Sequence, residues 1–251
     1  MRDVIVDGYA CAGGAARGYW DAGYDVIGVE LHPRDNYPYP CYRGDALETI
    51  PWLVTKLTRG GRRVAAVHTS PPCQDAIAIT AGNRCRDGWE DNHVDLIPDT
   101  REMLARVRAE HGVPTIIENG VSKRLRKDLM LCGLMFRLPT FRHRYFELDG
   151  FTVSPPRAHE GLHKGHRTIG WRHGHIATPE PSACPGCGEW HRGTVYGVYG
   201  DGGGKPSILE SQLALGLHHT DDRLELNEAI PPAYTRHIGL SLRDLEQRAA
   251  A

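Results

Sequence analysis

Short apolar runs recur along the first half of the chain, separated by stretches in which apolar side chains are spaced differently. The runs predict four strands, at residues 3–6, 24–30, 63–68 and 115–117. Between the strands, apolar side chains recur every three or four positions, which is typical of helices that bury one face. Strands that alternate with helices in this way predict an α/β fold, with a mostly parallel sheet covered by helices on both faces.

Two helices have clear ends in the sequence. The period at 47–57 predicts a helix that stops at Gly60-Gly61. The spacing of Asp99 and Glu102 predicts a capping box at the start of another helix, which stops at Gly112.

Ligands of such sheets bind at the carboxyl ends of the strands. Functional residues are therefore expected near 7–14, 30, 45, 70–74 and 118–119. From 150 to 205 the chain is rich in Pro, Gly and His and has no helical period, which predicts a smaller, loop-rich region.

Composition narrows the class of protein. The 251 residues are 40% hydrophobic, so the chain can bury a core, and 30 basic against 31 acidic residues exclude a uniformly basic surface. No run of about 18 apolar residues occurs and residues 1–6 do not resemble a signal peptide, so we expect a cytoplasmic protein. The seven cysteines are irregularly spaced, which favours reactive thiols or a metal site over a secreted disulfide framework.

A turn of small residues follows the first strand, from Asp7 to Gly14, and Glu30 ends the second strand where an acid that binds a ribose would lie. Only Gly13 fits the three glycine positions of the dinucleotide fingerprint. The turn therefore favours a nucleoside cofactor without a pyrophosphate, with an ordinary tight turn as the alternative.

The most specific signal is Thr69-Ser70-Pro71-Pro72-Cys73-Gln74. Two prolines after a buried strand present Cys73 at the sheet edge, where a thiolate can act as a nucleophile, and the next strand delivers Glu118. A purely structural cysteine is the alternative for Cys73 alone.

Taken together, four motifs resemble the ordered motifs of the cytosine-5 DNA methyltransferases, in a small form of phage or bacterial type. They are Pro71-Pro72-Cys73-Gln74, Glu118-Asn119, Arg142-His143-Arg144 and Ala229-Ile230-Pro231-Pro232-Ala233-Tyr234. The resemblance implies a Rossmann-like sheet that binds S-adenosylmethionine, a small target-recognition domain, and a target cytosine that is flipped out of the duplex. It divides the chain into a catalytic domain at 1–149 and 227–251 and a target-recognition domain at 150–226.

The resemblance also implies roles for individual residues. Cys73 would be the nucleophile, Glu118 the acid at nitrogen 3 of the base, and Arg142 and Arg144 the pair beside the catalytic pocket. Tyr9 would lie near the adenine, Glu30 at the ribose hydroxyls and Asp45 at the adenine amino group. The full set of implied cofactor-binding residues is Asp7, Tyr9, Ala10, Cys11, Gly13, Gly14, Glu30, Leu31, Asp45, Ala46, Pro71 and Ala229.

This sequence departs from the family pattern at three places. Cys11 replaces the first glycine of the cofactor turn, Gly120 replaces a valine, and Asn227-Glu228 replaces Gly-Asn. Residues 74–91 resemble the family's mobile loop, and the net basic stretch at 137–176 suits phosphate contacts.

A zinc knuckle is a separate prediction. Cys184, Cys187 and His191 have the types and spacing of zinc ligands, and His166, His173 or His175 would supply the fourth. The metal would stabilise a region with little core of its own; a reduced cysteine pair in a turn is the alternative.

The sequence thus predicts a monomeric S-adenosylmethionine-dependent DNA cytosine-5 methyltransferase that acts on double-stranded DNA, as in restriction-modification, with one structural zinc. The first alternative is the same chemistry on tRNA. A non-catalytic nucleic-acid-binding zinc module is the third possibility, and the set Cys73, Glu118 and Arg144 argues against it. A nicotinamide dehydrogenase is the fourth, and the incomplete glycine fingerprint argues against it.

Overall fold

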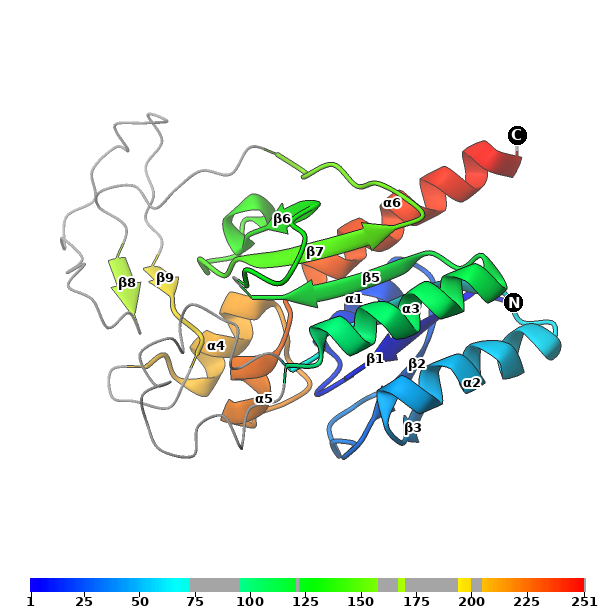
Figure 1. Cartoon of the computed structure of the whole chain (residues 1–251). Helices are drawn as coiled ribbons and strands as arrows, with labels where there is room; N and C mark the ends of the chain where they lie inside the picture. The colour runs from blue at the N-terminus through cyan, green and yellow to red at the C-terminus, as the bar shows by residue number, and fades with distance from the viewer. Residues whose placement is uncertain (73–94, 121, 158–166, 170–193, 200–204, 251) are drawn as a thin grey trace.

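The computed structural model of the protein describes residues 1–72, 95–120, 122–157, 167–169, 194–199 and 205–250 (Figure 1). A seven-stranded sheet forms its centre. The strands, in spatial order, are β3 (Cys41–Arg43), β2 (Asp25–Glu30), β1 (Val4–Gly8), β4 (Val64–Thr69), β5 (Thr115–Asn119), β7 (Arg144–Asp149) and β6 (Leu129–Leu131). All neighbouring pairs are parallel except those of β7, which runs antiparallel to both β5 and β6.

Helices cover both faces of this sheet, as predicted. α1 (Gly14–Asp21) and α6 (Pro232–Ala250) pack on one face, over a core that includes Tyr19, Phe146 and Tyr234. α2 (Ala46–Arg59) and α3 (Ile97–His111) pack on the other, and Figure 1 shows them side by side in front of the sheet. The α/β fold class and its Rossmann-like sheet are confirmed.

The contact between α1 and α6 depends on a small residue. A side chain at Gly18 would overlap the backbone oxygen of Pro232 and the hydroxyl of Thr235. Glycine at this position therefore lets α6, from the carboxyl end of the chain, lie directly on α1.

The remaining elements are short. They are the 3-10 helix η3 (Gly133–Phe136), the parallel pair β8 (Arg167–Ile169) and β9 (Thr194–Tyr196), α4 (Ile208–Leu215) and α5 (Arg223–Glu228). α4 and α5 enclose a small apolar cluster of their own, which includes Leu215, Leu226 and Ala229. None of the described helices is long and apolar enough to cross a membrane.

The predicted start of α3 is wrong. The helix begins at Ile97, two residues earlier than Asp99, and Asp99 lies in its first turn without capping it. Pro98 suits the first turn because proline has no backbone N–H, and the amides of a first turn have no acceptor within the helix. Asp95 accepts a hydrogen bond from the Ile97 amide at 3.1 Å. The predicted ends at Gly60 and Gly112 are confirmed, since both glycines follow directly after their helices.

Candidate active site

The turn after β1 has a strained backbone. Tyr9 and Cys11 adopt positive φ angles of 56° and 45°, and Gly13, which precedes α1, has a φ of 81°. Non-glycine residues adopt this conformation rarely, and strained backbone of this kind clusters at active and ligand-binding sites. The Tyr9 hydroxyl and the Thr100 hydroxyl of α3 are 3.0 Å apart, which fixes the tyrosine over the turn.

Glu30 ties this turn to the end of β2. Its carboxylate accepts hydrogen bonds from the Cys11 amide at 3.1 Å and from the Leu31 amide at 2.9 Å. The Leu31 side chain is 54% exposed beside it. Asp45 follows β3 and caps α2, where its carboxylate accepts from the Leu47 amide at 2.8 Å.

Asp7 is the buried acid of this edge. It is 1% exposed, and within the part of the chain that the structure describes its Oδ2 atom has no hydrogen-bond partner. Burial, followed by the charges of Glu30 and Glu118, raises the pKa of Asp7 well above its usual range. Three carboxylates around a tight turn suit the hydroxyl and amino donors of a nucleoside, so these residues fit the predicted cofactor.

The other residues predicted to bind the cofactor lie around the same turn. Ala10 is buried and donates its amide to Val29, and Gly14 opens α1 against the backbone of Ile230. Ala46 and Pro71 are buried, and Ala229 is buried at the end of α5.

Two side chains hold the turn against the segment that precedes α6. The Cys11 thiol donates to Glu228 at 3.3 Å, and Arg34 is 3.6 Å from the same carboxylate oxygen. His219 Nε2 is 2.6 Å from the carbonyl oxygen of Ala12. Burial and Glu228 raise the pKa of the Cys11 thiol to about 12, so this thiol stays protonated.

The structure places Pro71 and Pro72 of the Thr69–Gln74 motif next to β5 and the start of α3. The carbonyl of Pro71 accepts a hydrogen bond from the Asn119 side chain at 2.8 Å, and the carbonyl of Pro72 accepts from the Leu96 amide at 3.4 Å. The chain is thus fixed up to the residue before Cys73. Cys73 itself and the predicted mobile loop at 74–91 lie outside the described residues.

Glu118 and Arg144 form a buried ion pair at the same edge. Arg144 Nε lies 2.9 Å from Glu118 Oε1, and only 5% of the Glu118 side chain is exposed. Ser70 follows Thr69, the register partner of Ile117, and is a hydrogen-bonding neighbour that lowers the pKa of Glu118. The contact between Arg144 Nε and Glu118 Oε1 is an ion pair without hydrogen-bond geometry, and Oε1 accepts no hydrogen bond from any described residue. Burial raises the pKa of Glu118, while Arg144, Ser70 and Arg142 lower it.

Arg142 has different partners from its neighbour. It is buried and donates hydrogen bonds to the carbonyls of Val198 and Asn227, the second at 2.6 Å. The Tyr234 hydroxyl donates to the Arg142 carbonyl at 2.6 Å. Burial and the charge of Arg144 lower the pKa of Arg142 to about 9. Arg142 therefore connects the segment before β7 to the residues after β9 and to α5, and only its charge reaches Glu118.

The sequence analysis did not predict two buried polar side chains near the ion pair of Glu118 and Arg144. His68 of β4 and Tyr19 of α1 are fully buried, and the Tyr19 hydroxyl is 3.0 Å from His68 Nδ1. The only signal in the sequence is a histidine inside an apolar strand. Its partner is 49 positions away, so the spacing could not reveal the contact.

The predicted zinc site is not described. Cys184, Cys187, His191 and the three candidate fourth ligands, His166, His173 and His175, lie outside the described residues. Among the residues that the structure does describe, no group of three or more His, Cys, Asp or Glu side chains could hold a metal ion.

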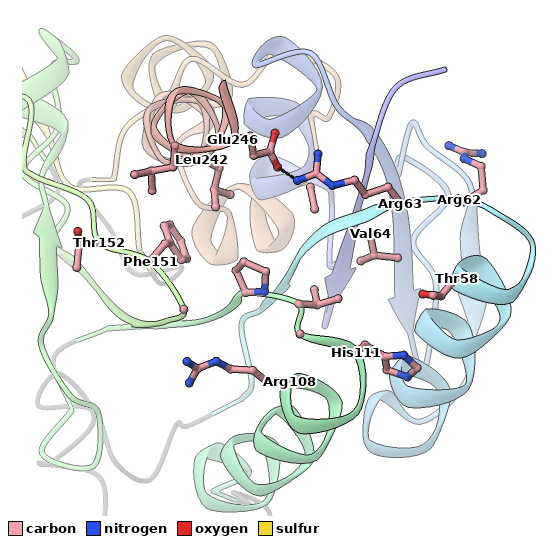
Figure 2. Close-up of a pocket in the computed structure, with 16 residues that line it drawn as sticks. Thr58, Arg62, Arg63, Val64, Arg108, His111, Phe151, Thr152, Leu242 and Glu246 are labelled. Atoms are coloured by element: carbon pink, nitrogen blue, oxygen red, sulfur yellow. Dashed lines mark hydrogen bonds and ion pairs between the residues drawn. The ribbon is translucent and has the colours of Figure 1, made fainter. Parts of the chain in front are cut away.

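A cavity of about 1130 Å³ lies at the opposite edge of the sheet (Figure 2). It opens where β4 begins at Val64 and where Pro114 leads into β5, between α3 and α6. Arg63, one of its cationic residues, is paired with Glu246 at 2.8 Å, and no unpartnered buried polar atom lines it. This cavity is separate from the predicted site.

Comparisons with solved structures support the fold. The S. pombe Dnmt2 methyltransferase aligns over 98% of this chain and 99% of its own, with 11% identity and a TM-score of 0.56. The Entamoeba histolytica methyltransferase EhMeth gives the same coverage and identity and a TM-score of 0.54. A Spodoptera frugiperda DNMT2 mutant is covered over only 48% of its length, with a TM-score of 0.39, an alignment too loose to support the fold.

Comparison with protein-family models and with curated protein sequences gives no match. The alignments to the S. pombe and Entamoeba structures show a shared fold, and at 11% identity they show nothing finer. The chain therefore has the Rossmann-like fold of these methyltransferases.

Proposed function

We propose that the protein is an S-adenosylmethionine-dependent cytosine-5 methyltransferase that acts on double-stranded DNA. The observation that carries this proposal is the buried pair of Glu118 and Arg144 beside Pro71-Pro72, the residues that lead to Cys73. The strained turn and its acids lie at the same edge of the sheet. Two methyltransferases with the same fold add support.

The reaction needs an acid and a nucleophile on one ring. The Cys73 thiolate would add to carbon 6 of cytosine, while protonated Glu118 gives its proton to nitrogen 3, so that carbon 5 becomes nucleophilic. Carbon 5 then takes the methyl group. A base then takes the proton on carbon 5, and the electrons of that bond form the double bond between carbons 5 and 6 and expel the Cys73 thiolate. Nitrogen 3 returns its proton to the Glu118 carboxylate, which restores the ring and the acid.

The surroundings of Glu118 suit this role. Burial raises its pKa, which favours the protonated form that the reaction requires, and Arg144 limits the rise. Arg144 lies against Oε1 and Ser70 lowers the pKa of the carboxyl, so the acid is surrounded by polar groups that act on its charge.

S-adenosylmethionine supplies an electrophilic methyl group. Glu30 and Asp45 would bind its ribose and adenine, and Asp7 would offer its unpartnered oxygen to a donor of the bound molecule. The turn from Tyr9 to Gly13 would contact the nucleoside through its backbone.

The proposal also names the nucleic acid that carries the target cytosine. Duplex DNA follows from the resemblance of the motifs, with residues 150–226 as the target-recognition domain, a zinc knuckle within it, and basic residues at 137–176 for phosphate contacts. The same chemistry on tRNA is the alternative, and the substrate comparison below separates the two.

A mechanism-based trap tests the proposal. A fluorine at carbon 5 cannot leave as a cation, so duplex DNA with 5-fluorocytosine and S-adenosylmethionine should leave a denaturation-resistant adduct. Cys73→Ser should abolish the adduct and keep DNA binding, whereas the matched control Cys85→Ser should retain both. An adduct that survives Cys73→Ser would refute the assignment of the nucleophile.

The same assay on 5-fluorocytosine tRNA decides the substrate. An adduct on the duplex alone supports DNA, and an adduct on tRNA alone replaces DNA by the alternative. Tight binding of NAD in place of S-adenosylmethionine would contradict the whole proposal.

A further inference from the structure

A line of hydrogen bonds leads from α1 to the carboxylate of Glu118. The Tyr19 hydroxyl is 3.0 Å from His68 Nδ1, and His68 Nε2 is 3.1 Å from the Ser70 hydroxyl. Ser70 is in turn the hydrogen-bonding neighbour that lowers the pKa of Glu118. The pairing of β4 with β5 explains the last step, because Thr69 lies opposite Ile117 and each next residue continues along the same edge.

The donors of this line can be assigned from chemistry. An ionised carboxylate only accepts hydrogen bonds, so Ser70 donates to Glu118 and its oxygen is left to accept. His68 is neutral, because burial lowers its pKa to about 3. A neutral imidazole has one donor and one acceptor, so Nε2–H donates to Ser70 and Nδ1 accepts from the Tyr19 hydroxyl. Every donor then points toward Glu118.

We infer that Tyr19 and His68 are positioning residues that orient the Ser70 hydroxyl toward the carboxyl group of Glu118 and so help to fix that acid for the target base. The inference rests on the proposed function of Glu118. Tyr19 and His68 touch no substrate atom, and no proton passes along the line. A carboxyl group keeps an acceptor oxygen when it is protonated, so a donor from Ser70 is compatible with both states of the acid.

The sites of Tyr19 and His68 support a specific role over simple core packing. Both residues are fully buried, and a buried polar group costs free energy unless it is hydrogen-bonded. Leucine or phenylalanine would fill the same space without that cost. Tyr24 offers the comparison on the same face of the sheet, since its hydroxyl donates to the Gly239 carbonyl at 3.3 Å.

Charged and titratable groups from every neighbouring element act on Glu118. They are Asp7 of β1, Arg144 of β7, Arg142 before β7, Tyr234 of α6 and Tyr19 of α1. Asp7 is also the register partner of His68. Tyr19→Phe removes one oxygen atom and leaves all these charges in place, so it isolates the hydrogen bond.

Nuclear magnetic resonance tests the donor assignment without any activity. In protein labelled with nitrogen-15 at histidine, the His68 signals, assigned with His68→Gln, should show the Nε2–H tautomer at pH 8 and no protonation down to pH 5. Tyr19→Phe should produce a mixture of tautomers, and Tyr24→Phe should leave the signals unchanged. An Nδ1–H tautomer, or ordinary titration near pH 6.5, overturns the inference.

Single-turnover methylation tests the positioning. The rate should fall as the pH rises through the pKa of Glu118, and loss of the Ser70 hydrogen bond should move that fall to higher pH, because the bond favours the charged form. Ser70→Ala and Tyr19→Phe should both move it, and both should lower the maximal rate by about tenfold with little change in KM.

The double variant should behave like Ser70→Ala alone, since both changes act through one bond. Tyr24→Phe should keep the wild-type profile, and identical profiles for Tyr19→Phe and Tyr24→Phe would overturn the inference. If the wild-type protein methylates neither DNA nor tRNA, the proposed function fails, and the tautomer of His68 then decides the donor assignment by itself.

Discussion

Replacing Arg144 by Gln should destabilise the protein in a manner that depends on pH. The change removes the cation 2.9 Å from Glu118 Oε1, where 5% of the Glu118 side chain and 19% of the Arg144 side chain are exposed, so solvent screens the pair little. Burial already raises the pKa of Glu118, and the loss of Arg144 raises it further. A raised carboxyl pKa contributes stability at low pH, and that contribution is lost as the pH rises through the folded-state pKa.

The magnitude follows from the two states of Glu118. At pH 8 an unpaired buried carboxylate should cost about 3 kcal/mol of the free energy of unfolding, as in other broken buried pairs. The loss should be smaller at pH 5.5, because a lower pH favours the protonated form, and it should approach about 1 kcal/mol, the value of an ordinary polar contact, as Glu118 becomes protonated. Urea unfolding of variant and wild type at both pH values measures the difference.

Arg106→Gln is the matched control. Arg106 is paired with Glu102 at 3.5 Å, but both side chains are about two-thirds exposed or more, at 68% and 73%. Its loss should change stability by about 0.5 kcal/mol or less at either pH. An equal loss at pH 5.5 and pH 8 for Arg144→Gln would refute the reasoning, because Arg144 would then not stabilise the charged form of Glu118.

Three further predictions concern the cofactor turn, the helix contact and the metal. Glu30→Gln leaves a weaker acceptor for the Cys11 amide and for ribose hydroxyls, so calorimetry should show about tenfold weaker S-adenosylmethionine binding with unchanged DNA affinity; an unchanged cofactor affinity would exclude Glu30 from the site. Gly18→Ala should cost about 2 kcal/mol in urea unfolding because its methyl group meets Pro232, and a neutral result would show that α6 can shift. Purified protein should contain one zinc that Cys184→Ser removes, and fully folded, active, metal-free protein would end that idea.

The strands that sequence patterns could predict are those whose stability comes from apolar burial. The predicted strand at 63–68 lies one residue further on, at Val64–Thr69, and every one of its residues is buried. β7 was missed because it carries a buried charge. Glu147 is compatible with a strand there only because Arg101 of α3 approaches it to 2.5 Å. Such a partner, 46 positions away, leaves no local pattern.

The same limit applies to the site. Motif resemblance singled out Glu118 and Arg144, and the structure brings them together. It also paired Arg142 with Arg144, but the carbonyl partners of Arg142 depend on how distant segments pack, which residue types do not encode. His68 and Tyr19 were missed for the same reason.

The raised thiol pKa values of the described cysteines have a practical consequence for labelling. The pKa of Cys11 is raised to about 12 and that of Cys41 to about 11, and burial also raises the pKa of Cys132. Alkylating reagents attack the thiolate, so all three should react very slowly at neutral pH. A thiol that is alkylated rapidly in the native protein must therefore be one of the other four, Cys73, Cys85, Cys184 and Cys187. Mass spectrometry can map the alkylated cysteines after a short pulse of iodoacetamide, with and without S-adenosylmethionine or zinc. Because Cys11, Cys41 and Cys132 should contribute little alkylation, the map would distinguish a nucleophile from metal ligands.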